Sequence, residues 1–290
     1  MKILGTGLNG LVGSRIVELL SSSYQFENMS RSDGIDITNK DQVYEKIVSS
    51  EASIVLHLAA KSNVDACEKD KELGIKGETW QTNVVGTQNI ANACVKSGKK
   101  LIYISTDFVF SGDDAPTDGY SEVDTPDPIN WYAMTKYEGE KIVINISVPW
   151  VILRLAYPYR ATFTKNDFFR AIKSRLEENK KTQVVSDYLF TPTFIDDFAI
   201  AIDTLIQKNM QGVFHVVGST SLHPYDAAIH IAEKFGLNKS LISPIVGDKY
   251  FENSAKRPFN LTIRNDKIKD IGVIMKTFDE GIAEIKKQLQ

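Results

Sequence analysis

The residues best suited to acid-base chemistry are a tyrosine and a lysine four positions apart, Tyr132 and Lys136. On a helix such a pair lies one turn apart on the same face. A free phenol has a pKa of about 10 and is a poor proton donor or acceptor near neutrality. A neighbouring ammonium favours the phenolate, so it would lower that pKa and prepare the pair to move a proton at a carbonyl or alcohol oxygen. A solvated helix face is the alternative interpretation of this spacing.

Three polar residues that could also take part in chemistry follow a strand-like run at 99–104. Ser105, Thr106 and Asp107 come directly after it, and in open α/β sheets ligands lie at the carboxyl ends of the strands. A hydroxyl at that edge can bond a substrate oxygen beside the tyrosine. Capping of a turn is the alternative role for Thr106.

Three glycines form the candidate phosphate-binding turn. A short apolar strand at 2–6 leads into Gly7, Gly10 and Gly13, and an apolar-periodic helix covers 14–20. Gly7 would allow the tight turn, Gly10 a close approach of backbone to a pyrophosphate, and Gly13 the packing of helix on strand. The helix start would offer unpaired N–H groups to the anion. The spacing is G-x-x-G-x-x-G, for which a purely structural turn is the alternative.

The end of the second strand, expected at 24–29, bears on cofactor choice. Ser30 and Arg31 stand there, and a guanidinium pairs well with phosphate, which favours the 2′-phosphate of NADP(H). Glu27 and Asp33 are close enough to keep NAD(H) open as an alternative, because a carboxylate can bond the ribose hydroxyl.

Strand-like and helical stretches alternate up to residue 155, which predicts an α/β fold with a doubly wound, Rossmann-like parallel sheet and a smaller C-terminal lobe. We expect a dinucleotide-binding domain at 1–156, to which 189–218 returns, and a substrate-binding lobe formed by 157–188 and 219–290. The expected strands are 2–6, 24–29, 53–58, 99–104, 150–155 and 212–217. The expected later helices are 166–178, 225–235 and 279–289, with a long loop at 111–128.

Other stretches have simpler interpretations. Residues 36–39 would start a helix with capping side chains, 63–70 would be a polar lead towards a helix containing 83–89, and 191–197 would cap a further helix. His57 and His215 lie within strand-like runs and are interpreted as packed core residues.

The length, net charge, apolar runs and cysteine count of the chain narrow the class of protein. The chain has 290 residues and a net charge of −3, without the stripe of Lys and Arg that a nucleic-acid surface needs. Its apolar runs are too short for a bilayer span, and no secretory signal pattern opens it. Two cysteines fit a reduced, cytoplasmic protein and give no metal pattern.

Together these motifs resemble the extended short-chain dehydrogenase/reductase superfamily and, more narrowly, the dTDP-4-dehydrorhamnose reductase family. The resemblance runs over nearly the whole chain. It is carried by the segments 6–13, 64–68, 105–112, 132–136, 192–197 and 257–260. The Ser-Thr-Asp-aromatic-Val-Phe run within 105–112 is the most family-specific of them.

The resemblance implies an NADP(H)-dependent reduction of a nucleotide-linked 4-keto-6-deoxy sugar, dTDP-linked by expectation, in dTDP-L-rhamnose biosynthesis. Tyr132 would be the general acid, Lys136 would lower its pKa and hold the ribose, and Thr106 would bond the carbonyl. Asp107 would assist at the substrate, and Tyr157 stands where the family holds the sugar. Apart from the resemblance, Arg257 could bond the nucleotide diphosphate in two places, for which an arginine that ties its segment to a surface carboxylate is the alternative. The expected cofactor-binding residues are Gly7, Asn9, Gly10, Leu11, Val12, Gly13, Ser30, Arg31, Asp36, Ile37, Leu58, Ala59, Ala60, Lys61, Ile104, Tyr132 and Lys136.

The chain departs from the family pattern at two places, and two other functions stay open. The segment 70–80 is longer than in most members of the family. Tyr157-Pro-Tyr-Arg160 stands where the family typically has a Trp, at a position that helps to hold the sugar, so the identity of the sugar stays open. One alternative is an NAD-dependent nucleotide-sugar epimerase or dehydratase, against which Phe108 after Asp107 counts. The other is a non-catalytic, NADP-binding subunit resembling the regulatory subunit of methionine adenosyltransferase. A homodimer is also expected.

Overall fold

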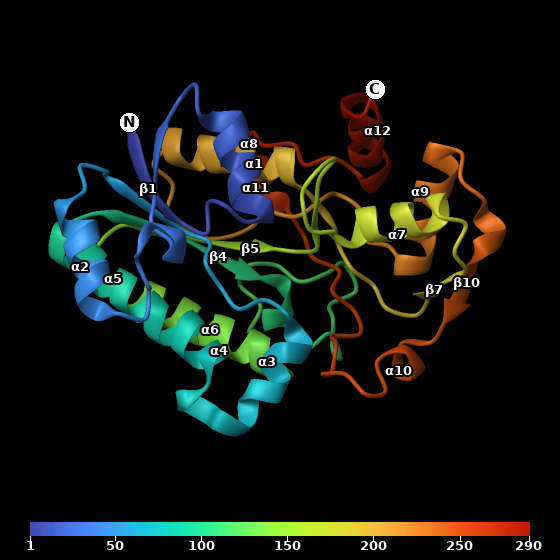
Figure 1. Cartoon of the computed structure of the whole chain (residues 1–290), viewed down its shortest axis with the longest axis horizontal. Helices are drawn as coiled ribbons and strands as arrows, with labels where there is room; N and C mark the ends of the chain where they lie inside the picture. The colour runs from blue at the N-terminus through green and yellow to red at the C-terminus, as the bar shows by residue number, and fades with distance from the viewer.

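A six-stranded parallel sheet forms the centre of the protein in a computed structural model that describes residues 1–290 (Figure 1). Every neighbouring pair of strands is parallel. This confirms the prediction of a doubly wound, Rossmann-like α/β fold. In spatial order the strands are β2 (Gln25–Asn28), β1 (Lys2–Thr6), β3 (Ile54–His57), β4 (Lys100–Thr106), β5 (Trp150–Leu155) and β9 (Gly212–His215).

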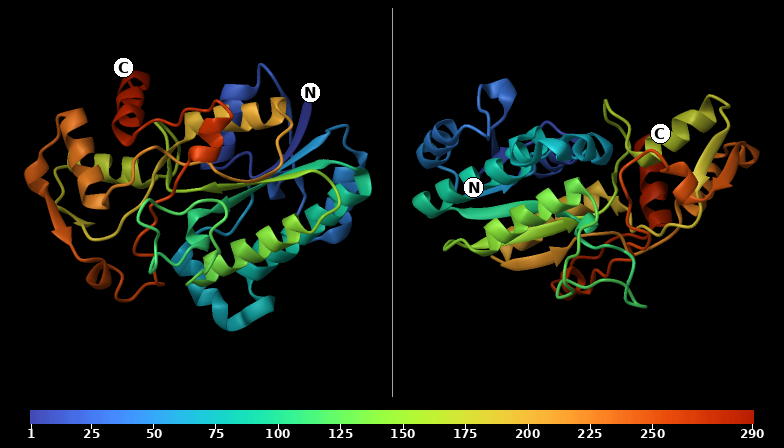
Figure 2. Two further views of the ribbon diagram at one scale, coloured as in Figure 1. Left: turned by 180° about the vertical axis from the view of Figure 1, so that it is seen from behind. Right: turned by 90° about the horizontal axis from the view of Figure 1, so that it is seen from below.

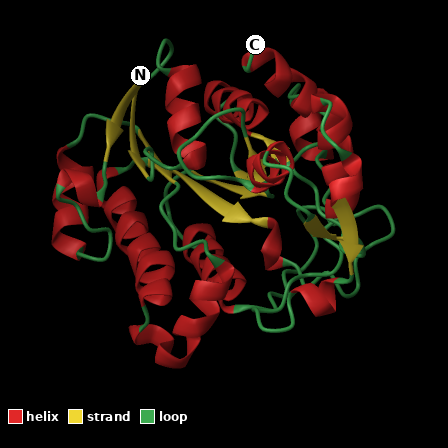
Figure 3. Cartoon of the chain, turned by 45° about the vertical axis from the view of Figure 1, so that its right-hand side comes forward, coloured by secondary structure: helices red, strands yellow, loops and turns green.

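Helices cover both faces of this sheet, as Figure 3 shows. Successive side chains of a strand point to opposite faces, so Ile102 and Ile104 join one apolar cluster while Leu101 and Tyr103 join the other. The first cluster packs beneath α1 (Leu11–Leu20), α8 (Ile195–Gln207) and α11 (Asp266–Asp270). The second packs against α2 (Lys40–Ser49), α5 (Gly86–Ser97) and α6 (Trp131–Ile144).

The register of the strands brings their carboxyl ends to one edge. Thr6 at the end of β1 pairs with His57 at the end of β3, and Thr106 pairs with Leu155 in the same way. β1 lies between β2 and β3, so the chain leaves it first to one side and then to the other. Ligands of open α/β sheets bind in the crevice outside such a switch point.

A further group of elements, the smaller lobe, lies at the right of Figure 1, is seen from two further sides in Figure 2, and has its own aromatic core. Tyr159, Phe169, Phe194 and Phe278 are buried together there. Its helices are α7 (Phe168–Glu177), α9 (Pro224–Phe235), α10 (Gly247–Tyr250) and α12 (Phe278–Gln288). Its strands form two small parallel pairs, β7 (Thr182–Val185) with β10 (Ile242–Ile245) and β6 (Pro158–Tyr159) with β8 (Thr193–Phe194).

Two local predictions were wrong. The polar lead at 63–70 is itself a helix, α3 (Val64–Asp70), because the Asn63 side chain caps it by accepting a hydrogen bond from the amide of Ala66. The segment 191–197 does contain the start of α8, but no side chain of the segment caps the helix. The N-cap of α8 is Phe194, without a side-chain cap, and the Asp197 carboxylate instead accepts a 2.7 Å bond from the amide of Lys276.

The remaining elements are short. The segment after α3 forms α4 (Glu78–Trp80) and a π-helical turn, Gln81–Val85, that runs into α5. Turns of 3₁₀ helix lie at Arg31–Asp33, Lys71–Lys76, Asp107–Val109 and Lys239–Leu241. His57 and His215 are buried, as predicted for core histidines, and burial lowers the pKa of each to about 3. None of the helices combines the length and apolarity needed to span a bilayer.

Candidate active site

The glycine turn after β1 is shaped by close backbone contacts. Gly7 has a φ of +70°, and a Cβ there would lie 2.9 Å from the amide nitrogen of Ala59. A Cβ on Gly13 would lie 2.4 Å from the carbonyl oxygen of Gly7. Gly10 is the N-cap of α1 and makes no side-chain cap bond. Small residues and a helix start therefore form a cradle that fits the diphosphate of a dinucleotide.

A cavity of about 470 Å³ extends from this cradle along the carboxyl edge of the sheet. Many of the residues expected to bind cofactor or substrate meet there. Those that line it are Gly7, Gly10, Leu11, Val12, Gly13, Leu58, Ala59, Ala60, Ile104, Thr106, Asp107, Tyr132, Lys136 and Tyr157. Ser105, which the sequence placed at the ligand edge, also lines it. The residues of the lining that sequence reasoning missed are Ser62, Val64, Phe108, Leu155 and Pro158.

Tyr132 and Lys136 lie in the first turns of α6. The helix starts where it does because the Asn130 side chain caps it, accepting a bond from the amide of Ala133. The Lys136 side chain is buried, and its Nζ donates a 2.7 Å hydrogen bond to the carbonyl oxygen of Ile104. The same ammonium lies 4.0 Å from the ring centroid of Tyr103. The hydrogen bond to Ile104 and the contact with the Tyr103 ring therefore hold the lysine side chain against β4.

The expected effect of Lys136 on Tyr132 is corrected by the structure. Burial raises the pKa of the Tyr132 phenol, and a hydrogen bond with Thr106 offsets only part of that rise. Burial also lowers the pKa of Lys136 to about 7, with Glu140 opposing. Desolvation outweighs proximity here because both groups are removed from water and the ammonium is directed to Ile104. The phenol is thus kept in its protonated form, which is the form that donates a proton.

Thr106 and Asp107 stand at the end of β4, beside Tyr132. The Thr106 hydroxyl donates a 3.0 Å bond to the Asp107 carboxylate and accepts one from the amide of Phe108. The second carboxylate oxygen of Asp107 and the hydroxyl of Ser105 are buried without a protein partner. Burial raises the pKa of Asp107 to about 7. Buried polar atoms without partners in a cavity wall are suited to bonding a polar ligand.

Tyr157 closes the cavity from the side of the smaller lobe. It is one of three non-glycine residues with positive φ, at 38°, a conformation that costs energy and is concentrated at functional sites. Its ring packs edge-on against Phe190 at 4.9 Å and tilted against Phe108 at 5.9 Å between centroids. Aromatic packing thus holds the strained residue at the cavity wall.

The residues expected at the ribose end form a polar group beyond the cavity lining. The Ser30 hydroxyl donates to the Asp33 carboxylate. The exposed Arg31 guanidinium lies 3.3 Å from the Asp36 carboxylate, and Lys61 pairs with a carboxylate at 2.7 Å.

Three further expected residues lie outside the lining. Asn9 is exposed on the glycine turn, and Ile37 is buried beneath α5. Arg257 is mostly buried and pairs with Asp65 at 2.9 Å.

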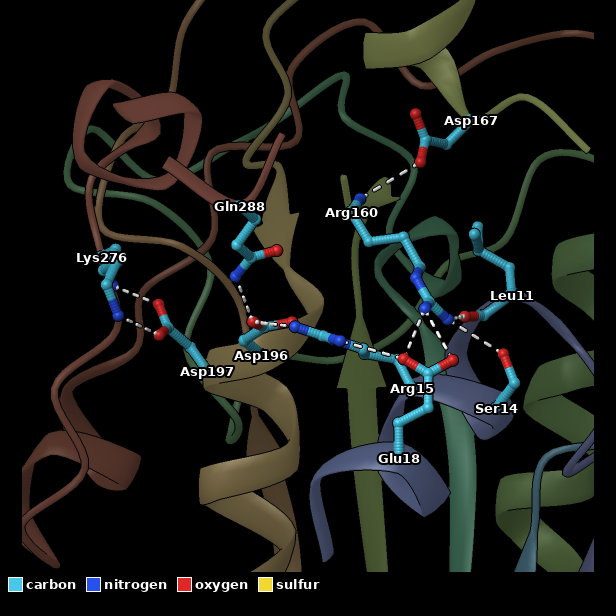
Figure 4. A network of polar contacts seen from close by, with 10 residues as sticks. All are labelled: Leu11, Ser14, Arg15, Glu18, Arg160, Asp167, Asp196, Asp197, Lys276 and Gln288. Carbon is cyan, nitrogen blue, oxygen red and sulfur yellow. Dashed lines mark hydrogen bonds and ion pairs between the residues drawn. The ribbon is translucent and has the colours of Figure 1, made fainter. Parts of the chain in front are cut away.

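Arg160, an arginine of the smaller lobe, connects this lobe to α1, the helix that follows the glycine turn (Figure 4). Arg160 is buried, and its guanidinium donates to both carboxylate oxygens of Glu18 at 2.8 and 2.7 Å. It also donates to the Ser14 hydroxyl at 2.9 Å. Its backbone amide donates to Asp167, the N-cap of α7. One residue therefore connects α1, through its side chain, with the N-cap of α7, through its backbone.

A second connection runs beside it. Arg15 donates two bonds of 2.7 Å to the carboxylate of Asp196 in α8, and the same carboxylate accepts a bond from Gln288 in α12. Asp197 pairs with Lys276 nearby (Figure 4). No group of three or more His, Cys, Asp and Glu side chains is arranged to hold a metal ion.

Comparisons with known proteins cover nearly all of the chain or all of it. The family model described as the RmlD substrate binding domain matches residues 1–290. A dTDP-4-dehydrorhamnose reductase of Aggregatibacter actinomycetemcomitans is 28% identical, over 92% of this chain and 92% of that protein. Methionine adenosyltransferase 2 subunit beta of Mus musculus is 27% identical, over 98% of this chain and 86% of that protein.

Among solved structures, a dTDP-4-dehydrorhamnose reductase from Bacillus anthracis in complex with NADP aligns with a TM-score of 0.90. It is 28% identical, and the alignment covers 99% of each chain.

Proposed function

The chain belongs to the family of the RmlD substrate binding domain, and from that premise we propose that it reduces the keto group of a nucleotide-linked 4-keto-6-deoxy sugar with NADPH. It is an NAD(P)H-dependent oxidoreductase of nucleotide sugars, with NADP(H) preferred and NAD(H) as the alternative. The finer assignment, a dTDP-linked sugar on the way to dTDP-L-rhamnose, rests on the relatives and on the motifs at 105–112 and 132–136.

One observation carries the proposal. The glycine cradle, the Thr106 hydroxyl, and the Tyr132 phenol line the same cavity at the switch point of the sheet. The glycine turn at the start of α1 would hold the cofactor's diphosphate, and the cavity continues from it along the carboxyl edge of the sheet to Thr106 and Tyr132. A proton donor, a hydrogen-bond donor, and a cofactor cradle are the parts that carbonyl reduction needs.

Each residue has a stated role in the reaction. The bound nicotinamide cofactor supplies the reducing equivalents. The Thr106 hydroxyl, which donates to Asp107 in the structure, would turn its one proton to the carbonyl oxygen and orient that oxygen towards Tyr132. The Tyr132 phenol then gives its proton to that oxygen as negative charge develops there, because a positioned acid lowers the barrier to alkoxide formation. Lys136 fixes α6 against β4 through Ile104, and Asp107 contacts the sugar.

The smaller lobe is proposed to hold the nucleotide sugar. Tyr157 reaches the cavity from it, and Arg160 fastens it to α1. We retain the division of the chain into 1–156 with 189–218 and 157–188 with 219–290 as part of this proposal. A homodimer and a cytoplasmic location remain predictions.

The competing assignment is a regulatory, non-catalytic subunit, for which the likeness to methionine adenosyltransferase 2 subunit beta is the specific observation. The test is loss of reduced nicotinamide absorbance when purified protein, NADPH and a dTDP-4-keto-6-deoxy sugar are combined. We expect stoichiometric NADPH oxidation and a reduced sugar product by mass spectrometry. Tight NADPH binding with no oxidation across a panel of nucleotide keto-sugars would favour the regulatory role instead.

A further inference from the structure

Two cations at the ribose end of the cofactor site meet at one carboxylate oxygen. Oε1 of Glu78 lies 2.7 Å from the Nζ of Lys61 and 3.6 Å from Nη1 of Arg31. The three residues come from different segments: the loop after β3, the 3₁₀ turn after β2, and α4. Their convergence places a lysine and an arginine where a single anion can bridge them.

A phosphate group could occupy that place as the carboxylate does. It presents more acceptor oxygens and carries more negative charge, and guanidinium and ammonium groups both bind it through charge-assisted hydrogen bonds. Lys61 directly follows Ala60 of the cavity lining, and Arg31 follows the end of β2. The cation pair therefore lies at the end of the cofactor site where a dinucleotide carries its adenosine ribose.

We propose that Glu78 is an internal competitor of the cofactor's 2′-phosphate, which occupies Arg31 and Lys61 when no phosphate is present and so limits the preference for NADP(H) over NAD(H). The inference rests on the proposed function, since it requires a nicotinamide dinucleotide in the cavity. It assigns a selectivity role to a residue outside the cavity lining.

The segment that presents Glu78 is held in place from both ends. The Asp70 carboxylate accepts a 2.5 Å hydrogen bond from the amide of Thr79, which closes the segment 70–79 on itself. Trp80 stacks on Trp131 with ring centroids 5.7 Å apart. The backbone next to Glu78 is thereby anchored to the helix that carries Tyr132.

The Glu78 side chain, in contrast, can move away from Arg31 and Lys61. It is 55% exposed, so it can turn into water without breaking packing when a phosphate takes the two cations. Binding of NADPH must then break its ion pairs, whereas NADH leaves them in place. Removing the carboxylate should therefore help NADPH alone.

The test compares the dissociation constants of NADPH and NADH by titration calorimetry or by quenching of tryptophan fluorescence. In Glu78→Gln we expect the constant for NADPH to fall roughly two- to thirtyfold, the range spanned by two exposed ion pairs. We expect the constant for NADH to stay unchanged or to rise. Arg31→Met and Lys61→Met should each weaken NADPH binding and spare NADH binding.

Glu72→Gln is the matched control. Glu72 is an exposed glutamate of the same segment that makes no ion pair with Arg31 or Lys61, so its variant has the same change of charge without the local effect. We expect it to bind both cofactors as the wild type does. In the double variant Lys61→Met/Glu78→Gln, the gain from Glu78→Gln should shrink, because one of the two competed cations is gone.

Three results would overturn the inference. An unchanged ratio of the two constants in Glu78→Gln would show that the carboxylate does not compete. An equal gain in Glu72→Gln would show a general effect of charge. If the wild type bound neither cofactor, the proposed function itself would fail and this inference with it, whereas NADPH binding with an unchanged ratio would remove the inference alone.

Discussion

The ammonium of Lys136 donates its hydrogen bond to the main-chain oxygen of Ile104, 2.7 Å away in β4, and not to the phenol of Tyr132 on the same face of α6. Ile104 lies two residues before Thr106 in the strand. The lysine therefore fixes the helix that carries the proton donor to the strand that carries the hydroxyl. The hydroxyl of Tyr103 in β4 also donates to the carbonyl oxygen of Lys136, so two hydrogen bonds hold Tyr132 and Thr106 in their relative places.

Replacing Lys136 by Met should change how stability depends on pH. Burial lowers the Lys136 pKa to about 7, whereas a lysine in the unfolded chain titrates near about 10.4. Between these values the unfolded chain binds more protons, so the free energy of unfolding rises with pH there. The variant should lack this slope, of up to about 1.4 kcal/mol per pH unit, in denaturant unfolding. Lys141→Met, exposed on the same helix, should keep it, and an identical slope in the Lys136 variant would contradict the burial argument.

Tyr132→Phe should nearly abolish reduction and leave cofactor binding intact. The substitution removes the phenolic proton and keeps the ring, which packs edge-on against Phe108. Loss of a positioned acid typically lowers the rate by roughly 10²–10⁴-fold. Steady-state rates at saturating sugar, together with the NADPH dissociation constant, check this. Turnover at the wild-type rate would remove Tyr132 from its proposed role.

Asp107→Asn should stabilise the protein above neutral pH. The pKa of the buried carboxyl is raised to about 7, compared with about 3.9 when unfolded. Between these values the folded state binds more protons, so the wild type loses stability as pH rises through the window. The variant should gain melting temperature relative to the wild type from pH 4 to 7, with no further gain above. Asp113→Asn, in the exposed loop, should show no such trend, and a trend shared by both variants would refute the assignment.

Gly13→Ala should damage folding, and Gly10→Ala should damage cofactor binding. A Cβ on Gly13 would lie 2.4 Å from the carbonyl oxygen of Gly7, while one on the exposed Gly10 would lie 3.1 Å from the same oxygen. Overpacking of that kind costs about 1–3 kcal/mol, so Gly13→Ala should lower the unfolding free energy by this amount. Gly10→Ala should melt near the wild type but bind NADPH more weakly. Equal melting temperatures for the two variants would argue against the close-packed turn.

Arg257→Met should raise the KM for nucleotide sugar and leave the NADPH dissociation constant unchanged, because we expect the guanidinium to bond the diphosphate of the nucleotide sugar. In the structure its guanidinium pairs with Asp65 and donates to the carbonyl oxygen of Ala255. Asp65→Asn is the control, because it removes the ion pair but keeps the arginine charge. A lower melting temperature in both variants, with an unchanged KM in Arg257→Met, would show that the arginine serves only to tie its segment to α3.

Much of the fold follows from local pattern. Strand and helix alternation predicted the parallel sheet, and the glycines between β1 and α1 predicted the turn. The exceptions depend on single contacts. The helix α3 is short and polar, and one buried side chain, Cys67, with the cap from Asn63 accounts for its packing. The start of α8 is set by the pairing of β6 with β8, which brings together residues 35 apart in sequence, so side-chain capping at 191–197 was the wrong inference.

The sequence predicted which residues line the site better than it predicted their pKa values. Motifs placed Tyr132, Lys136 and Thr106, and strand ends placed the cavity. The pKa of Tyr132 was expected in the wrong direction because sequence spacing reports proximity and not burial. Leu155 was missed although it follows a simple rule, since it ends β5 at the ligand edge of the sheet.

The sixth strand has a consequence for biosynthesis. β9 pairs with β5 but is translated only after α7, β7 and α8. Until it emerges from the ribosome, the β5 edge of the nascent sheet has unpaired backbone groups, which invite pairing with other chains. The apolar face of the sheet that α8 covers is also exposed to water until α8 has been synthesised. The N-terminal part of the chain therefore cannot complete its core during its own synthesis, and a fragment ending after β5 would be prone to aggregate rather than to bind cofactor.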